Sequence, residues 1–199
     1  MSASALTELV NIEIGKTETL PMDRIQRLLK KIGPHYINDV GKTATMGYKT
    51  NATPLDWAIE SKQLEIVKAV VEAGADVNYQ INTMSVYISH PLEKCVGFVS
   101  VPIEITEYLL EKGSNPNIPP LKPTHGYSHL IKTDTPYQIA IKQERYRHIL
   151  AFLEAGYPLP AEAAETRDVI SRLCRISLSG GKRKMNSRKN TRRKIRKVN

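Results

Sequence analysis

Residues 53–78 read TPLDWAIESKQLEIVKAVVEAGADVN, and this stretch decides the fold. It opens on Thr53 and Pro54, a pair suited to a helix start, because Thr can cap the first turn and Pro needs no N–H partner there. Apolar residues spaced three and four apart then give each half of the stretch one apolar face. Gly74 stands where the chain must leave the second helix with a positive φ. The stretch predicts a pair of short helices closed by a glycine.

Two further segments have the same plan: HPLEKCVGFVSVPIEITEYLLEKGSNPN at 90–117 and TPYQIAIKQERYRHILAFLEAGYPLP at 135–160. In the first and third units 21 residues separate the opening Thr from the closing Gly, whereas 23 separate His90 from Gly113. We expect the two extra residues within FVSVP, 98–102. No such helix pair can bury its apolar face alone, so the units must stack on one another.

These segments resemble ankyrin repeats. The first follows the family's pattern closely, with Asp56 where the family usually has His, and in the second unit His90 replaces the capping Thr. The resemblance covers roughly residues 4–160. It implies an all-α ankyrin-repeat solenoid of about four helix pairs, in which partners bind on the concave surface formed by the finger loops and the first helix of each pair.

Four regions follow from this resemblance. Residues 1–38 form a degenerate N-terminal capping repeat, since Ile25, Leu28, Leu29 and Ile32 share one helical face before Gly33. Residues 39–160 hold three ankyrin-like repeats. We expect a capping helix at 161–178, with Val169, Ile170, Leu173 and Cys174 on its buried side, and a disordered basic tail at 179–199.

The connections between units are longer than the family's period allows. A period of about 33 residues leaves about 12 from the closing Gly to the next Thr, but here the three connections span 20, 16 and 22 residues. All three finger loops are therefore lengthened, and we expect them to contribute to binding. The candidate partner-binding residues carried over from the family are Lys49, Thr50, Glu60, Ser61, Tyr87, Phe98, Lys132, Lys142 and Gln143.

The positive charge is concentrated at one end of the chain. The sequence has 29 Lys and Arg against 20 Asp and Glu, a net charge of +9. Ten of the basic residues follow Gly181, so 19 basic residues face 20 acidic ones in the body, and a basic surface is not expected there. These ten residues are Lys182, Arg183, Lys184, Arg188, Lys189, Arg192, Arg193, Lys194, Arg196 and Lys197.

Three interpretations of this tail stay open. Its cations could contact phosphates of a nucleic acid, in which case affinity would fall steeply with salt. KRK and RRKIRK could form a nuclear import signal read by an importin. The tail could also be a solubilising end with general polyanion affinity. A Gly-Gly joint followed by a Lys/Arg run behind divergent repeats is similar to ankyrin proteins of giant nucleocytoplasmic DNA viruses, which implies interaction with host proteins.

No motif for catalysis or for metal binding stands out. VGKT at 40–43 lacks the earlier Gly of a phosphate-binding loop, and we interpret it as a turn in a finger loop. His125 and His129 have zinc-like spacing but no supporting Cys, so we expect neither a metal nor another cofactor. Cys95 and Cys174 are interpreted as reduced thiols in or near a core, and Trp57 and the partly buried His148 as structural residues.

Taken together, these features predict a non-enzymatic protein–protein interaction module. The alternative is a nucleic-acid-associated protein in which the tail contacts phosphates and the repeats are a docking platform. No signal peptide and no membrane-length apolar run is visible, so we expect an intracellular protein, cytoplasmic or nuclear, or in a virion or host cell if viral. We also expect a monomer.

Overall fold

The structure, a computed structural model, describes residues 2–12, 22–43, 50–80, 90–98, 100–119, 134–161, 163 and 166–172 of the chain. It divides into two compact units, Met1–Tyr157 and Pro158–Asn199. In the second unit residues 166–172 are helical, with Ile170 buried and Val169 half-buried. Leu173 and Cys174 lie outside the described residues.

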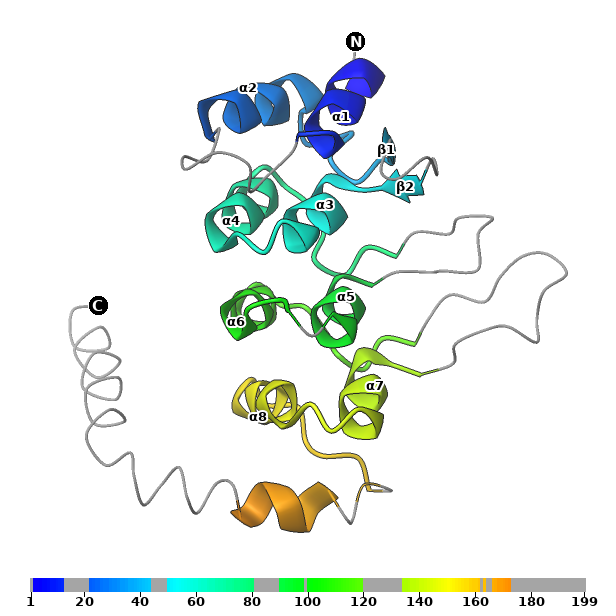
Figure 1. The fold of residues 1–199 in the computed structure, drawn as a ribbon, viewed down its shortest axis with the longest axis vertical. Helices are drawn as coiled ribbons and strands as arrows, with labels where there is room; N and C mark the ends of the chain where they lie inside the picture. The colour runs from blue at the N-terminus through cyan, green and yellow to red at the C-terminus, as the bar shows by residue number, and fades with distance from the viewer. Residues whose placement is uncertain are drawn as a thin grey trace, which may run out of the picture. The chain divides into compact units, whose positions relative to one another are not determined.

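The first unit is built from helix pairs (Figure 1). We call the first helix of each pair the inner helix and the second the outer helix. The inner helices stack in one column and the outer helices in another, and each helix contacts the next one in its own column. The inner helices are α1 (Ser2–Val10), α3 (Pro54–Glu60), α5 (Pro91–Gly97) and α7 (Pro136–Lys142). The outer helices are α2 (Met22–Ile32), α4 (Leu64–Glu72), α6 (Ile103–Glu111) and α8 (Tyr146–Glu154). This helical architecture agrees with the predicted all-α class.

Apolar faces of both columns supply the core. The predicted face of α2 is confirmed, since Ile25, Leu28, Leu29 and Ile32 are all buried. In α4 the buried residues are Ile66, Val67 and Val70, whereas Leu64 and Val71 are half-buried. The largest fully buried side chains of the later helices are Leu92, Ile105, Leu109, Tyr137, Ile149 and Phe152.

The inner helices start as their sequences predict. Thr53 and Thr135 accept a hydrogen bond from the backbone N–H three residues on, and in return Asp56 and Gln138 accept from the two Thr N–H groups. Both caps are therefore complete capping boxes. At the start of α5 the imidazole Nδ1 of His90 takes this role and accepts from Leu92 N–H at 3.1 Å.

The Thr135 cap gives a direct test of the third unit. Thr135→Ala should lower the free energy of unfolding by about 1 kcal/mol, because it leaves an N–H at the first turn of α7 without its acceptor. Thr135→Ser keeps the oxygen and should stay close to the parent protein. Urea unfolding followed by circular dichroism measures both variants, and equal stability of the two would contradict the cap.

The glycines that close the pairs have the predicted conformation. Gly74 and Gly113 have φ values of 103° and 91°, in the region that favours glycine. The two extra residues of the second unit also lie where expected. The α5–α6 connection spans 98–102, whereas 61–63 join α3 to α4 and 143–145 join α7 to α8.

One finger has a short hairpin at its base. Strands β1 (Gly41–Thr43) and β2 (Thr50–Ala52) pair antiparallel, with Gly41 opposite Ala52. The interpretation of VGKT as a turn was therefore wrong, because its last three residues are a strand. The stretch packs against the first helix: a Cβ on Gly41 would lie 2.8 Å from Val10 Cγ2 and 3.0 Å from the Leu6 carbonyl oxygen.

This close approach predicts that Gly41→Ala destabilises the N-terminal part of the first unit. A methyl group here must displace the Val10 side chain and crowd the Leu6 carbonyl, which should cost about 1–3 kcal/mol. Gly97→Ala is the matched control, since a Cβ at this helical residue meets no atom within 4 Å and alanine is the better helix former. Thermal unfolding of both variants is the measurement, and an unchanged melting temperature for Gly41→Ala would contradict the packing.

Candidate functional site

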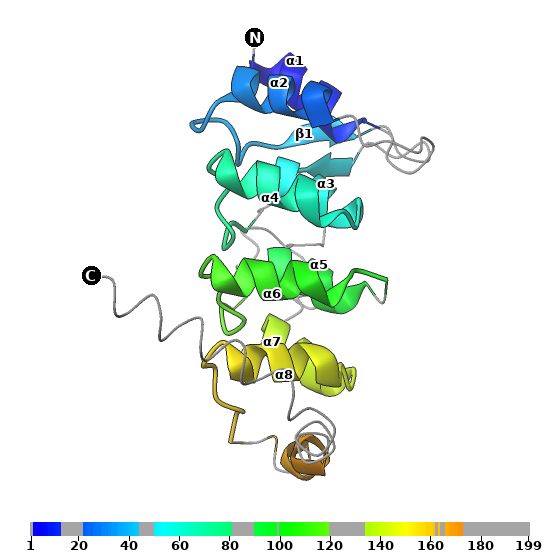
Figure 2. The ribbon, with the colours of Figure 1, turned by 90° about the vertical axis from the view of Figure 1, so that its left-hand side faces the viewer.

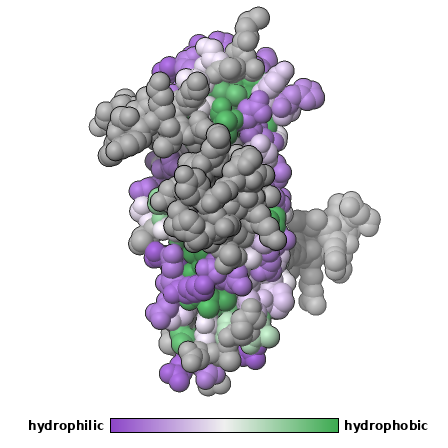
Figure 3. Space-filling view, turned by 90° about the vertical axis from the view of Figure 1, so that its right-hand side faces the viewer, coloured by the Kyte–Doolittle hydropathy of each residue, from purple (hydrophilic) through white to green (hydrophobic). Residues whose placement is uncertain are grey.

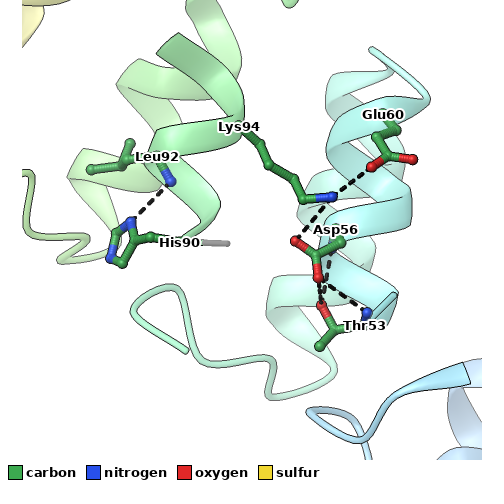
Figure 4. A network of polar contacts seen from close by, with 6 residues as sticks. All are labelled: Thr53, Asp56, Glu60, His90, Leu92 and Lys94. Carbon is green, nitrogen blue, oxygen red and sulfur yellow. Dashed lines mark hydrogen bonds and ion pairs between the residues drawn. The ribbon is translucent and has the colours of Figure 1, made fainter. Parts of the chain in front are cut away.

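An ion network, buried at Asp56 and exposed at Glu60, joins the inner helices α3 and α5 (Figure 4). The Asp56 carboxylate, 2% exposed, accepts from Thr53 N–H at 3.1 Å and from Thr53 Oγ1 at 2.9 Å. Lys94 Nζ reaches across from α5, 3.5 Å from Asp56 Oδ1 and 2.5 Å from Glu60 Oε1. Asp56 therefore belongs both to the cap of α3 and to the contact between two repeats.

The electrostatics of Lys94 follow from its surroundings. Burial lowers the pKa of its ammonium group, but the carboxylates of Asp56 and Glu60 outweigh burial, and the net pKa is raised. Lys94 thus stays charged and neutralises one of two nearby carboxylates. Sequence analysis missed this residue because its partners are more than 30 positions away. One feature of the sequence could have predicted this contact: the second unit has Lys94 at the position where the first unit has the apolar Trp57.

Five of the predicted binding residues lie at one end of the inner helices. Glu60 is the last residue of α3 and Ser61 is its C-cap. Lys142 and Gln143 are the last residue and the C-cap of α7, and Phe98 is the C-cap of α5. Four of the five are exposed, and Ser61 is half-buried. Lys142 Nζ is paired with Asp134 at 2.7 Å, a surface contact worth little stability.

The other predicted site residues do not lie at this end of the inner helices or are outside the described residues. Thr50 begins β2 and so lies at the finger end of α3, opposite Glu60. Lys49, Tyr87, Lys132, His125 and His129 lie outside the described residues, as do the ten basic residues of the tail. Figure 3 shows the side of the inner helices, where hydrophilic side chains surround small hydrophobic areas.

The turns after the outer helices form a second set of contacts that sequence analysis missed. Asn38 Oδ1 accepts from Asp76 N–H at 2.9 Å, and one repeat later Asn78 Oδ1 accepts from Asn115 N–H at 2.8 Å. Asn78 also donates to the Gly113 carbonyl at 3.1 Å. These side chains tie successive turns together at the bases of the fingers. The sequence feature that could have predicted these contacts is an Asn four or five residues after the closing Gly.

The structural interpretations of Cys95, Trp57 and His148 are confirmed. Cys95 is fully buried, and burial raises its pKa to about 12, so its thiol is not a nucleophile. Trp57 is buried and its Nε1 donates to the Ile12 carbonyl at 3.3 Å. His148 is half-buried, and burial, assisted by Arg145, lowers its pKa.

The described residues contain neither a metal-binding cluster nor a helix that could span a membrane. In the part of the chain that the structure describes, no group of three or more His, Cys, Asp or Glu could hold a metal ion. None of the helices described there combines the length and the apolarity that crossing a membrane requires.

Comparison with known proteins agrees with the geometry. Residues 50–82 match the family model described as ankyrin repeat, the stretch that contains β2, α3, α4 and the turn after Gly74. Comparisons with curated proteins and with solved structures gave no match. Ankyrin repeats are generally protein-interaction modules and typically non-enzymatic. The comparison thus shows one ankyrin repeat within this chain, at residues 50–82.

Proposed function

We propose that the first unit is a four-repeat ankyrin module that binds a protein partner through its lengthened fingers and the exposed ends of its inner helices. The observation that carries this proposal is the placement of Glu60, Ser61, Lys142 and Gln143 at corresponding ends of α3 and α7, two repeats apart. The ion pair between Asp56 and Lys94 links α3 to α5. Contacts of this kind between inner helices give the exposed side chains a rigid support.

The partner contacts proposed on the fingers are Lys49, Thr50, Tyr87 and Lys132. Aromatic residues contribute most to interface energetics, so Tyr87 should be the strongest of these contacts. Phe98 differs from them, because it lies in a turn between two helices and not on a finger, and a separate role for it is argued below. If the tail's similarity to giant-virus proteins reflects the source, the partner is a host protein.

Affinity purification from cell lysate with mass spectrometry tests the proposal. The full chain would be compared with a 1–178 truncation, each with and without nuclease. We expect one discrete protein to survive both truncation and nuclease treatment. Loss of all specific capture with the tail or with the nuclease would overturn the proposal.

A variant pair then locates the binding face. Lys142→Ser with Gln143→Ser removes two exposed groups at the end of α7 and should weaken capture of the discrete protein at least tenfold. Lys30→Ser with Lys31→Ser changes two exposed residues of the outer helix α2 and is the matched control. Equal capture by both double variants would place the contact elsewhere.

A second candidate function rests on the ten basic residues after Gly181. In that case the tail supplies affinity for nucleic acid and the repeats are a docking platform. Ten phosphate contacts would give a log–log salt slope of about −9 for duplex DNA binding. A slope of about −2 or shallower, or an unchanged affinity in the 1–178 truncation, would exclude this candidate.

A further inference from the structure

The connections that follow the inner helices α3, α5 and α7 lie along one edge of the first unit (Figure 2). Two of them, 61–63 and 143–145, have the same length of three residues. Lys62 and Glu144 occupy corresponding places in them, with left-handed φ values of 62° and 54°. The α5–α6 connection lies between these two, and it is the one that carries the two-residue insertion.

The middle connection has an aromatic ring on this edge, because Phe98 is the C-cap of α5 where Ser61 and Gln143 are the C-caps of α3 and α7. Phe98 is 49% exposed, one of the most exposed large apolar residues described. Its backbone is held in the turn, because Phe98 N–H donates to the Lys94 carbonyl at 3.1 Å and its carbonyl accepts from Val101 N–H at 3.2 Å. Val101 is buried, which fixes the turn to the core. The backbone of Phe98 is thus hydrogen-bonded on both sides, and its side chain is about half exposed.

The residues on either side of Phe98 carry opposite charges. Lys62 and Glu144 are both exposed, and neither takes part in an ion pair within the described residues. The neighbouring Arg145 is half-buried and its Nε lies 3.4 Å from Gln143 Oε1. Along the edge, one repeat apart each time, the order is cation, aromatic ring, anion.

This order is self-complementary under a two-fold rotation. A second copy laid antiparallel along the edge brings Phe98 against Phe98, and at both ends it brings Lys62 against Glu144. An isologous contact of this kind uses one surface patch on both subunits. We propose that this edge binds a second copy of the chain, with the two Phe98 rings at the centre and two Lys62–Glu144 pairs flanking them.

The contact should be weak. It is formed by three short connections, so its area falls below the roughly 1,200 Å² of stable interfaces, and its exposed ion pairs are screened by salt. The expected behaviour is reversible dimerisation that strengthens with protein concentration and weakens as sodium chloride rises. This inference does not rest on the proposed function. Because the edge includes Ser61 and Gln143, a dimer formed there would compete with the proposed partner, and it is an alternative to the monomer expected from the sequence.

Charge reversal tests the geometry. Sedimentation velocity of the full chain at about 5–500 µM would give the dimer dissociation constant. Lys62→Glu alone and Glu144→Lys alone should each weaken dimerisation at least tenfold, because each places like charges together at both ends. The double variant restores both pairs and should return to within threefold of the parent. Phe98→Ser should also weaken dimerisation at least tenfold.

The most specific test of this geometry is a mixture of the Lys62→Glu and Glu144→Lys variants. One chain then has Glu at 62 and 144 and the other Lys at both, so a mixed dimer has two attractive pairs and should form more tightly than either variant alone. Lys30→Glu on α2, an exposed residue away from this edge, is the control for net charge. A parent chain that stays monomeric across the range, or single variants whose effects add without rescue, would overturn the proposal.

Discussion

Replacing His90 by Thr should remove most of the acid sensitivity of the second repeat. His90 is 3% exposed and caps α5 through Nδ1, which leaves its proton on Nε2. Nε2 is buried and has no hydrogen-bond partner among the described residues. Protonating Nδ1 would remove the acceptor of the Leu92 N–H and bury a charge. Burial accordingly lowers the pKa of His90 to about 4, although Asp76 opposes this shift.

The sign of the pH effect follows from that lowered pKa. In the unfolded chain a histidine has a pKa of about 6.5, so as pH falls the unfolded state takes up the proton first. The contribution of His90 to stability is therefore complete above about pH 6.5 and is lost as pH falls toward 4. Linkage puts the loss at about 2–3 kcal/mol by pH 4.5.

The experiment compares the parent protein with His90→Thr in urea between pH 7 and pH 4.5. Thr is the cap of the first and third units, so the variant should keep its cap and lie within about 1 kcal/mol of the parent at pH 7. Fluorescence of Trp57, the single tryptophan, reports unfolding. His148 titrates in both proteins and cancels in the difference. Parallel pH profiles would show that His90 does not control the acid response.

Phe152→Ala should produce the largest loss of stability at pH 7. Phe152 is fully buried in α8, and its ring meets Tyr137 of α7 edge-on, with 5.0 Å between centroids and 66° between planes. Truncation removes the ring, leaves a cavity between the two columns and ends the aromatic contact. Such substitutions cost about 3–5 kcal/mol, a large part of a domain's total stability.

Glu154→Ala gives the matched control at the exposed end of the same helix. It should change the free energy of unfolding by less than about 0.5 kcal/mol. Chemical unfolding of both variants should therefore show one large and one negligible shift. A cost below about 1 kcal/mol for Phe152→Ala would mean that the inner and outer helices of this pair are not packed as described.

Local rules in the sequence were enough to find the repeat units. The Thr-Pro starts, the closing glycines and the apolar spacing each depend on residues within about four positions of one another. The two extra residues of the second unit were located for the same reason, since a helix that starts at Pro91 has a length set by its own pattern. Cys95, Trp57 and His148 were likewise recognised as structural.

The candidate site was predicted only in part. The family resemblance indicated the exposed ends of the inner helices, and Glu60, Lys142 and Gln143 are exposed there. It did not indicate that Thr50 lies at the opposite end of α3. Helix-capping preferences also did not predict the role of His90, which caps α5 although His is not among the preferred capping residues. VGKT was misinterpreted because strand pairing and its packing on α1 are not local properties.

The sequence by itself determined where helices begin, where they end and which faces they bury, because these properties arise within a single turn of chain. Only the tertiary structure decided which distant residues meet. Stacking sets the register between repeats, and register brings Lys94 to Asp56, ties Asn78 to Asn115, and aligns Lys62, Phe98 and Glu144 along one edge. Residues about 40 positions apart become neighbours because each repeat advances the stack by one helix diameter, roughly 10 Å.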